Sequence, residues 1–180
     1  MTTWATERPS RSKWRRKALT TVPVVLVLGM LSGWLSNSGF SNDWFVALRK
    51  PSFMPPGWVF GVVWTSLYII MGLALAMVLA APRSRARLVG LALFTIQLLL
   101  NLAWSPVFFG AGMIGWAMVI IVVLVVLVAV TILMFWRVRP LAGALLLPYL
   151  AWLCLASALN WEIGRLNPGA DKAPLAMMGA

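Results

Sequence analysis

Five long apolar runs divide the chain, and the short segments between them hold most of its charge. An α-helix needs about 17 to 25 apolar residues to cross a bilayer core roughly 30 Å thick, and each run is of that length. Irregular backbone is not stable in lipid, so the runs predict an all-α membrane protein, a bundle of five transmembrane helices. The expected helices are residues 18–35, 57–81, 87–108, 116–136 and 141–164.

The two ends of the chain lack this apolar pattern. Residues 1–17 are polar and basic, and the tail from residue 165 contains Pro168, Gly169 and Pro174. We expect a disordered N-terminal segment and a flexible C-terminal tail around a single domain of residues 18–164.

The connection 36–56 is the longest, and we expect the rest of the bundle to be organised around it. It sets Arg49 and Lys50 beside aromatic residues and breaks at three prolines before the second helix. Gly57 and Gly61 then lie one turn apart, a spacing that allows close helix approach. Because its backbone cannot lie bare in lipid, the connection is expected to cap the bundle and a ligand pocket within it.

The net charge is +11, and the basic residues are distributed as the topology of a membrane protein requires. Fifteen Lys and Arg stand against four Asp and Glu, and six of the fifteen lie between Arg8 and Lys17, before the first apolar run. Eleven basic residues fall on the side of the N-terminus and four on the other, which predicts that the N-terminus lies in the cytoplasm and the C-terminus outside. The membrane is expected to be a bacterial cell membrane. Lipid or nucleic-acid binding by the basic segment is the alternative, and the charge positions argue against nucleic acid.

Residue types that most enzymes and metal sites need are scarce. The chain has no histidine, four carboxylates and one cysteine, Cys154, inside an apolar run. We therefore expect no intrachain disulfide, no metal site, no cofactor and none of the usual acid–base or nucleophilic catalysis.

Polar and aromatic side chains share one face on each of three helices. Polar groups inside a span are costly, so each needs a partner or a role. The faces comprise Trp64, Thr65, Tyr68 and Gly72; Gln97, Asn101, Trp104 and Ser105; and Tyr149, Trp152, Ala156 and Asn160. The second helix starts outside and the other two end outside, so the faces meet beneath the loop and predict a ligand pocket. Interfacial anchoring and contacts between helices are the alternative interpretation.

Four passages resemble the TspO/MBR family of tryptophan-rich sensory and translocator proteins. They are WFVALRKPSFMPPGWVFGVVWTSLY, QLLLNLAWSPVFFG, LLLPYLAWLCLASALN and NWEIGRLN. The resemblance implies a five-helix bundle, usually dimeric, that binds porphyrins and, in some members, cholesterol and drug-like ligands beneath the first loop. The residues that match its ligand site are Trp44, Phe45, Pro55, Trp64, Asn101, Trp104, Ser105, Trp152 and Ala156.

Two departures from the family pattern bear on the ligand. Trp161 stands where the cholesterol-recognition pattern of animal members has a tyrosine, so the strict sterol pattern fails. Phe45 replaces a tyrosine of some relatives and removes one hydroxyl from the mouth of the expected pocket.

The leading hypothesis is a membrane protein that binds or senses tetrapyrroles. A porphyrin has a flat aromatic face that suits Trp64 and Trp152, and two carboxylates that suit Arg49 and Lys50. Tyr68, on the same face as Trp64, completes the predicted site. The alternatives are an enzyme that degrades porphyrin in light, with the two tryptophans as candidate catalytic residues, and a porphyrin transporter.

A homodimer is also expected. Ala86, Gly90 and Phe94 lie one turn apart on the third helix and begin a stripe that would admit a neighbouring helix. The pair Gly29 and Gly33 on the first helix is the rival interface.

The charge distribution makes a direct prediction about topology. A reporter fused after Ala180 should read as extracytoplasmic and one fused after Pro82 as cytoplasmic, because basic loops stay on the cytoplasmic side. Paired activity reporters in intact cells measure both positions. The reverse pair would contradict the orientation.

Overall fold

The structure is a computed structural model that describes residues 11–171. Within this part of the chain five helices are long and apolar enough to cross a membrane, which confirms the all-α, five-span fold. The helices are α1 (Arg11–Leu35), α2 (Asp43–Ala47), α3 (Gly57–Leu79), α4 (Arg85–Ser105), the π-helix η1 (Pro106–Gly110), α5 (Ile114–Val138), α6 (Pro140–Ala144) and α7 (Leu147–Leu166). Residues 1–10 of the expected disordered N-terminal segment and residues 172–180 of the expected flexible tail lie outside the described residues.

Helix α1 begins at Arg11, earlier than the start expected at Ala18, so residues 11–17 are helical and not disordered. The stretch 11–22 contains no Gly or Pro, and Lys, Arg and Ala are favourable helix formers, which lets the helix extend beyond the membrane-spanning part. The start of the expected tail is also ordered. Residues 165 and 166 belong to α7, and the Asp171 carboxylate accepts hydrogen bonds from the first amides of α5, at Ile114 and Gly115.

Prolines modify the third and fifth spans. At the end of α4, Pro106 lacks an amide donor, and the chain continues as a π-helix in which the Ala111 amide bonds to the Pro106 carbonyl at 2.8 Å. In the fifth span, Pro148 stands in the first turn of α7, where α6 ends and the helix restarts. Each span therefore runs further than its main α-helix.

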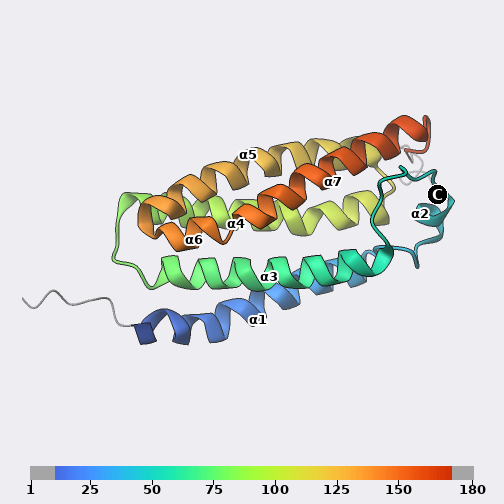
Figure 1. Cartoon of the computed structure of the whole chain (residues 1–180). Coiled ribbons are helices and arrows are strands. Elements are labelled where there is room, and N and C mark those ends of the chain that lie inside the picture. The colour runs from blue at the N-terminus through green and yellow to red at the C-terminus, as the bar shows by residue number, and fades with distance from the viewer. Residues whose placement is uncertain (1–10, 172–180) are drawn as a thin grey trace, which may run out of the picture.

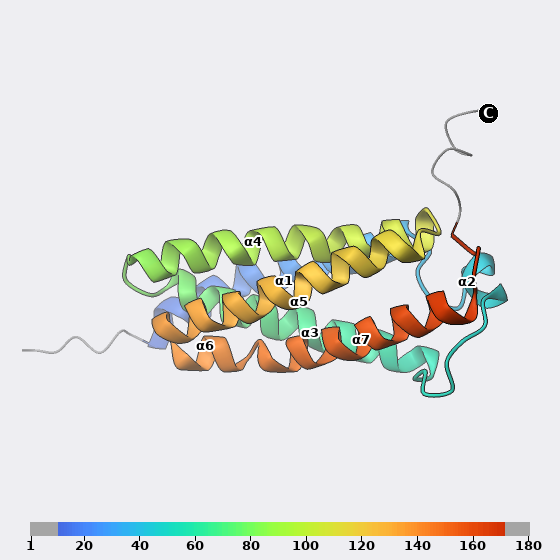
Figure 2. The same ribbon diagram turned by 90° about the horizontal axis from the view of Figure 1, so that it is seen from above.

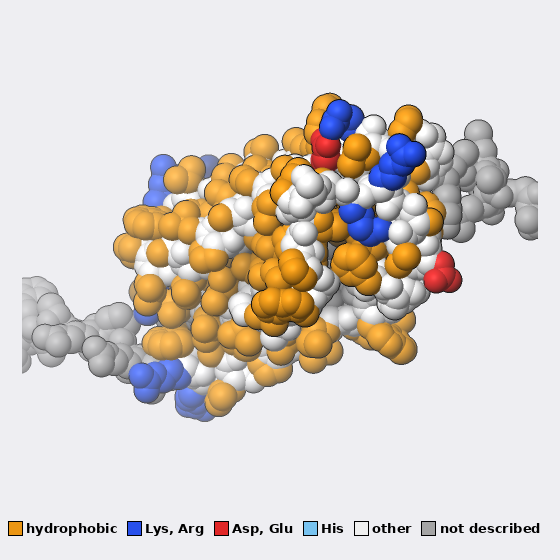
Figure 3. Space-filling model, turned by 45° about the vertical axis from the view of Figure 1, so that its right-hand side comes forward, with side chains coloured by type: hydrophobic (Ala, Val, Ile, Leu, Met, Phe, Trp, Pro, Cys, Tyr) orange, Lys and Arg blue, Asp and Glu red, His pale blue; other side chains and the backbone are white. Residues whose placement is uncertain are grey.

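The spans form a bundle in which α1 lies along α3 and α4 lies along α5 (Figures 1 and 2). The start of α3, the ends of α4 and α7, and the short helix α2 all lie at one end of the bundle, as the sequence predicts (Figure 1). Figure 3 shows an apolar belt between Lys and Arg side chains at the two ends, with acidic side chains visible only at the end that holds α2. This belt is the surface expected to face lipid.

Glycines determine where the helices approach most closely. A Cβ at Gly72 would lie 2.6 Å from the Cα of Val22, so α1 and α3 meet backbone to backbone there. The Thr21 hydroxyl donates to the Gly72 carbonyl at 2.7 Å and secures the contact. The close approach expected at Gly61 is absent, since no atom lies within 4 Å of its Cβ position.

Both glycine stripes considered for a dimer are used inside the chain. A Cβ at Gly90 would lie 3.1 Å from the Phe135 ring of α5, and Phe94 is buried with its ring stacked on Phe135. This stripe therefore serves the α4–α5 contact and is not free for a second copy, which corrects the expected interface. Gly29 faces the ring of Tyr68 in α3. The homodimer itself stays a prediction.

The two α3 glycines give a matched test of this packing. Gly72→Ala should lower the melting temperature of the purified protein in detergent, with a cost of about 1–3 kcal/mol, because the backbone of α1 must move. Gly61→Ala, in the same helix but with open space around it, should leave the melting temperature unchanged or slightly raised. Equal effects of the two changes would contradict the assigned contact.

Candidate functional site

A chain of hydrogen bonds joins three helices in the buried centre of the bundle. The Tyr68 hydroxyl donates to Asn101 Oδ1 at 3.1 Å, and Asn101 Nδ2 donates to the Tyr149 hydroxyl oxygen at 3.0 Å. The Tyr149 hydroxyl in turn donates to Gln97 Oε1 at 3.1 Å. All four side chains are buried, so these polar groups of α3, α4 and α7 find partners in one another. We call these four residues the polar network.

An aromatic cluster lies directly on the polar network. Trp64 stacks on Tyr68 with ring centroids 5.3 Å apart, and it meets the edges of Tyr149 and Trp152 at 6.4 and 6.5 Å. Phe60 also packs against Trp152, with ring centroids 5.6 Å apart. The two tryptophans expected to hold a ligand are therefore in mutual contact, and the network behind them determines their positions.

A groove of about 500 Å³ opens beside this cluster, between α3 and α7. It is lined by Val62, Val63, Ser66, Leu67 and Ile70 of α3 and by Pro148, Ala151, Trp152 and Leu155 of α7. Several of these side chains are exposed on the apolar belt, so the groove opens sideways onto the surface that is expected to face lipid. The Nε1 atom of Trp152 is buried and has no hydrogen-bond partner among the described residues. A side chain that lines the groove thus has a buried donor without an acceptor in the described part of the chain.

A second aromatic cluster fills the space beneath the loop. Trp104 stacks on Phe108 at 4.9 Å, and Trp44 and Phe45 of α2 meet the edge of Phe108 at 5.6 and 6.1 Å. Trp104 Nε1 donates to the Ala117 carbonyl at 3.1 Å, which fixes that indole against α5. This cluster packs the loop onto the bundle, and the ligand pocket expected beneath the loop stays a prediction.

Three side chains hold the irregular loop in place. The Lys50 ammonium donates to the carbonyls of Phe45, Val46 and Leu48 at 2.8–2.9 Å and so satisfies the end of α2. Its partial burial lowers the pKa of Lys50 below the ordinary lysine value. Asn42 caps the start of α2 by accepting from the Phe45 amide at 3.0 Å, and its Nδ2 donates to Phe109 of η1.

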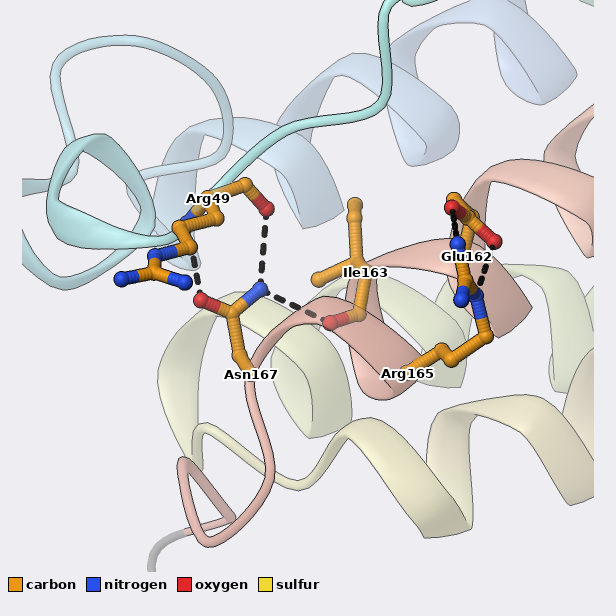
Figure 4. A network of polar contacts seen from close by, with 5 residues as sticks. All are labelled: Arg49, Glu162, Ile163, Arg165 and Asn167. Atoms are coloured by element: carbon orange, nitrogen blue, oxygen red, sulfur yellow. Dashed lines mark hydrogen bonds and ion pairs between the residues drawn. The ribbon is translucent and has the colours of Figure 1, made fainter.

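Asn167, the third of these side chains, ties the loop to the end of α7. Its Oδ1 accepts from the Arg49 amide and its Nδ2 donates to the Arg49 carbonyl, both at 2.8 Å (Figure 4). The Arg49 side chain is exposed and its guanidinium points away from Asn167, whereas Arg165 pairs with Glu162 (Figure 4). Of the two cations expected to meet ligand carboxylates, Lys50 is occupied by the loop and Arg49 is exposed at its surface.

Comparison with known proteins gives a consistent result. Residues 21–166 match the model of the TspO/MBR family. The chain belongs to the TspO/MBR family. It is 47% identical over 154 residues to the tryptophan-rich protein TspO of Chlorobaculum tepidum, covering 80% of this chain and 98% of that protein. It is 44% identical over 145 residues to the human translocator protein (79% and 85% covered) and 39% identical over 153 residues to the protein CrtK of Rhodobacter capsulatus (84% and 96% covered).

The structure divides the predicted site residues of this TspO/MBR chain into two groups. Trp64, Tyr68, Asn101 and Trp152 meet in the centre of the bundle, and Ala156 packs against the same core. Trp44, Phe45 and Trp104 belong to the cluster beneath the loop. Pro55 is partly buried in the loop, and Ser105 is partly buried at the end of α4.

The structure brings four further residues, which the sequence-based prediction left out, into contact with the predicted site residues. Gln97 and Tyr149 complete the polar network, and their position on the predicted polar faces was the signal that could have included them. Phe108 stacks on Trp104, and Asn167 holds the loop through the backbone of Arg49. Neither has a local signal, because their roles depend on partners distant in sequence.

The polar network predicts a cost for removing its central member. Asn101→Leu keeps the volume but leaves the hydroxyls of Tyr68 and Tyr149 each without one partner, so stability should fall by about 0.5–2 kcal/mol. Thermal unfolding in detergent measures this change in stability. Thr95→Val is the control, because Thr95 is exposed and its hydroxyl donates to the Leu91 carbonyl of the same helix. The double change with Tyr149→Phe should cost less than the two single changes added together. Strict additivity would show that the bonds are not coupled.

Proposed function

We propose that this protein binds a tetrapyrrole, a flat and largely hydrophobic macrocycle, in the groove between α3 and α7. One observation carries the proposal. Trp152 lines the groove, and its indole Nε1 is buried without an acceptor among the described residues. An unpaired buried donor costs about 1–3 kcal/mol, so an acceptor atom on a ligand at this point would offset that cost.

The shape and chemistry of the groove support the same class of ligand. Its volume of about 500 Å³ lies within the range of small-molecule sites, roughly 300–1,000 Å³. Its walls are almost wholly apolar and it opens toward lipid, which suits a ligand that is dissolved in the membrane. Sterol-like and drug-like aromatic molecules share these properties, and we expect them to compete for the same groove.

The aromatic cluster provides the surface on which a macrocycle would stack. Trp64 and Trp152 cross at 86°, so a ligand that lies flat on one ring meets the edge of the other. Lys50 is engaged by three loop carbonyls, so we assign Arg49 alone as the cation available to a ligand carboxylate near the loop. Binding and sensing in the membrane need no further chemistry from the protein.

Replacing the groove tryptophans tests the proposal. Trp152→Phe and Trp64→Phe remove an indole N–H and stacking area, so porphyrin affinity should fall by a few-fold to tenfold, about 1 kcal/mol. A titration of the purified protein, followed by quenching of its tryptophan fluorescence and by porphyrin absorbance, measures this. Trp116→Phe and Trp136→Phe are the controls, because both side chains are exposed at the ends of α5. If all four changes behave alike, the tryptophans are interfacial anchors and the groove assignment is wrong.

The contact of four oxidisable rings favours a second candidate, light-dependent porphyrin breakdown. Trp152, Trp64, Tyr68 and Tyr149 form a continuous set of ring contacts, from which an excited porphyrin could take an electron while dissolved oxygen serves as the final oxidant. The same titration under illumination separates the functions. A binding protein leaves the porphyrin spectrum intact, an enzyme bleaches it, and the loss of bleaching in Trp152→Phe should then exceed the loss of affinity. A transporter would instead move porphyrin across sealed vesicles.

A further inference from the structure

A second groove lies at the opposite end of the bundle from the loop, between the first turns of α1 and the last turn of α3. Its volume is about 630 Å³. Its lining includes Lys13, Arg16, Lys17, Thr20 and Thr21 of α1 and Leu79 of α3. The groove is remote from the aromatic cluster and plays no part in the proposed tetrapyrrole site.

The positive charge of this groove has no counter-charge in the described part of the chain. Lys13, Arg16, Lys17 and Thr20 follow the spacing i, i+3, i+4 and i+7, which places them on one face of α1. The acidic residues within 11–171 are Asp43, Glu162 and Asp171, and they belong to the loop, the end of α7 and the segment after it. Three cations therefore share a concave surface with no acidic side chain beside them among the described residues.

The end of α3 would ordinarily disfavour an anion at this position, because the last carbonyls of a helix carry partial negative charge. Here Arg87 removes that obstacle. Its Nε donates to the Val78 carbonyl at 3.0 Å and its Nη2 to the Leu79 carbonyl at 3.2 Å. These carbonyls at the end of α3 are thus already hydrogen-bonded, and the cations of α1 dominate the electrostatic field in the groove.

The depth of the groove matches the headgroup layer of a bilayer. Helix α1 has 25 residues, so it is about 37 Å long, and it exceeds the roughly 30 Å hydrocarbon core by about 7 Å, a little over one turn. The basic residues occupy its first turns. Further along α1, Leu19, Val24 and Val27 are 79%, 50% and 59% exposed and offer an apolar surface to acyl chains. Along α1 the side chains therefore change from cationic to hydroxyl to apolar. A phospholipid has the matching order of phosphate, glycerol esters and acyl chains.

We propose that this groove is a binding site for an anionic phospholipid. The lipid phosphate lies among Lys13, Arg16 and Lys17, and the Thr20 hydroxyl donates to a glycerol ester carbonyl. The acyl chains run along the exposed apolar face of α1. A free phosphate would satisfy the cations but not the apolar surface beside them, so the geometry favours the lipid.

Lipid titration of the full-length protein in neutral detergent tests the site. Native mass spectrometry counts bound dioleoyl phosphatidylglycerol, with dioleoyl phosphatidylcholine and inorganic phosphate as competing probes. The combined change K13Q/R16Q/K17Q should lower the apparent affinity for phosphatidylglycerol by about tenfold or more. The matched control R83Q/R85Q/R137Q removes three exposed cations at the same end but outside the groove, and its effect should stay below about threefold.

Each outcome decides the proposal. Equal losses in the two triple variants would show a diffuse surface charge and overturn the site. Displacement of the lipid by inorganic phosphate at the same concentration would assign the groove to a free anion and overturn the lipid. Thr20→Val changes no charge and should weaken phosphatidylglycerol binding a few-fold, so full affinity in that variant would also contradict the assigned pose. If the triple variant does not fold, Lys17→Gln against Arg85→Gln makes the same comparison.

Discussion

Hydrocarbon offers no hydrogen bonds, so each polar group within a span must find its partner inside the protein. Asn101 meets this constraint by joining Tyr68 of α3 to Tyr149 of α7, and Tyr149 passes the chain of bonds back to Gln97 of α4. Three helices are thereby held at one rotation about their axes. Because Trp64 stacks on Tyr68, the same bonds also determine the position of the groove wall.

The same constraint explains the loop between α1 and α3. This stretch has irregular backbone at the membrane boundary, and side chains satisfy it where a helix cannot. Lys50 closes the end of α2 with three carbonyls, and Asn167 pairs with both backbone groups of Arg49. Of the two loop cations, Lys50 thus has a structural role through its side chain, whereas Arg49 is held only by its backbone and its guanidinium stays exposed.

Much of this architecture could be predicted from the sequence, because its causes are local. The length of each apolar run sets a span, and a spacing of three and four residues places Asn101, Tyr149 and Trp152 on inward faces. What could not be predicted depends on distant partners. Asn167 and Arg49 are separated by 118 positions, and nothing near either residue indicates the other. The Gly90 stripe has the same pattern whether its partner is α5 or a second copy, and basic residues 11–17 suit both an exposed helix and a disordered segment.

Two tryptophans show how a structural and a functional role are told apart. Trp104 and Trp152 both lie on polar faces of spans, both are partly buried, and both stack or pack against other rings, so no sequence pattern separates them. The structure separates them by a single atom. Trp104 Nε1 bonds to the Ala117 carbonyl, whereas Trp152 Nε1 is buried without a partner beside an open groove. A satisfied indole needs nothing more than its neighbours, while an unsatisfied one gains free energy from whatever acceptor enters the groove. This difference supports the proposed ligand site along α7 over a site in the cluster beneath the loop.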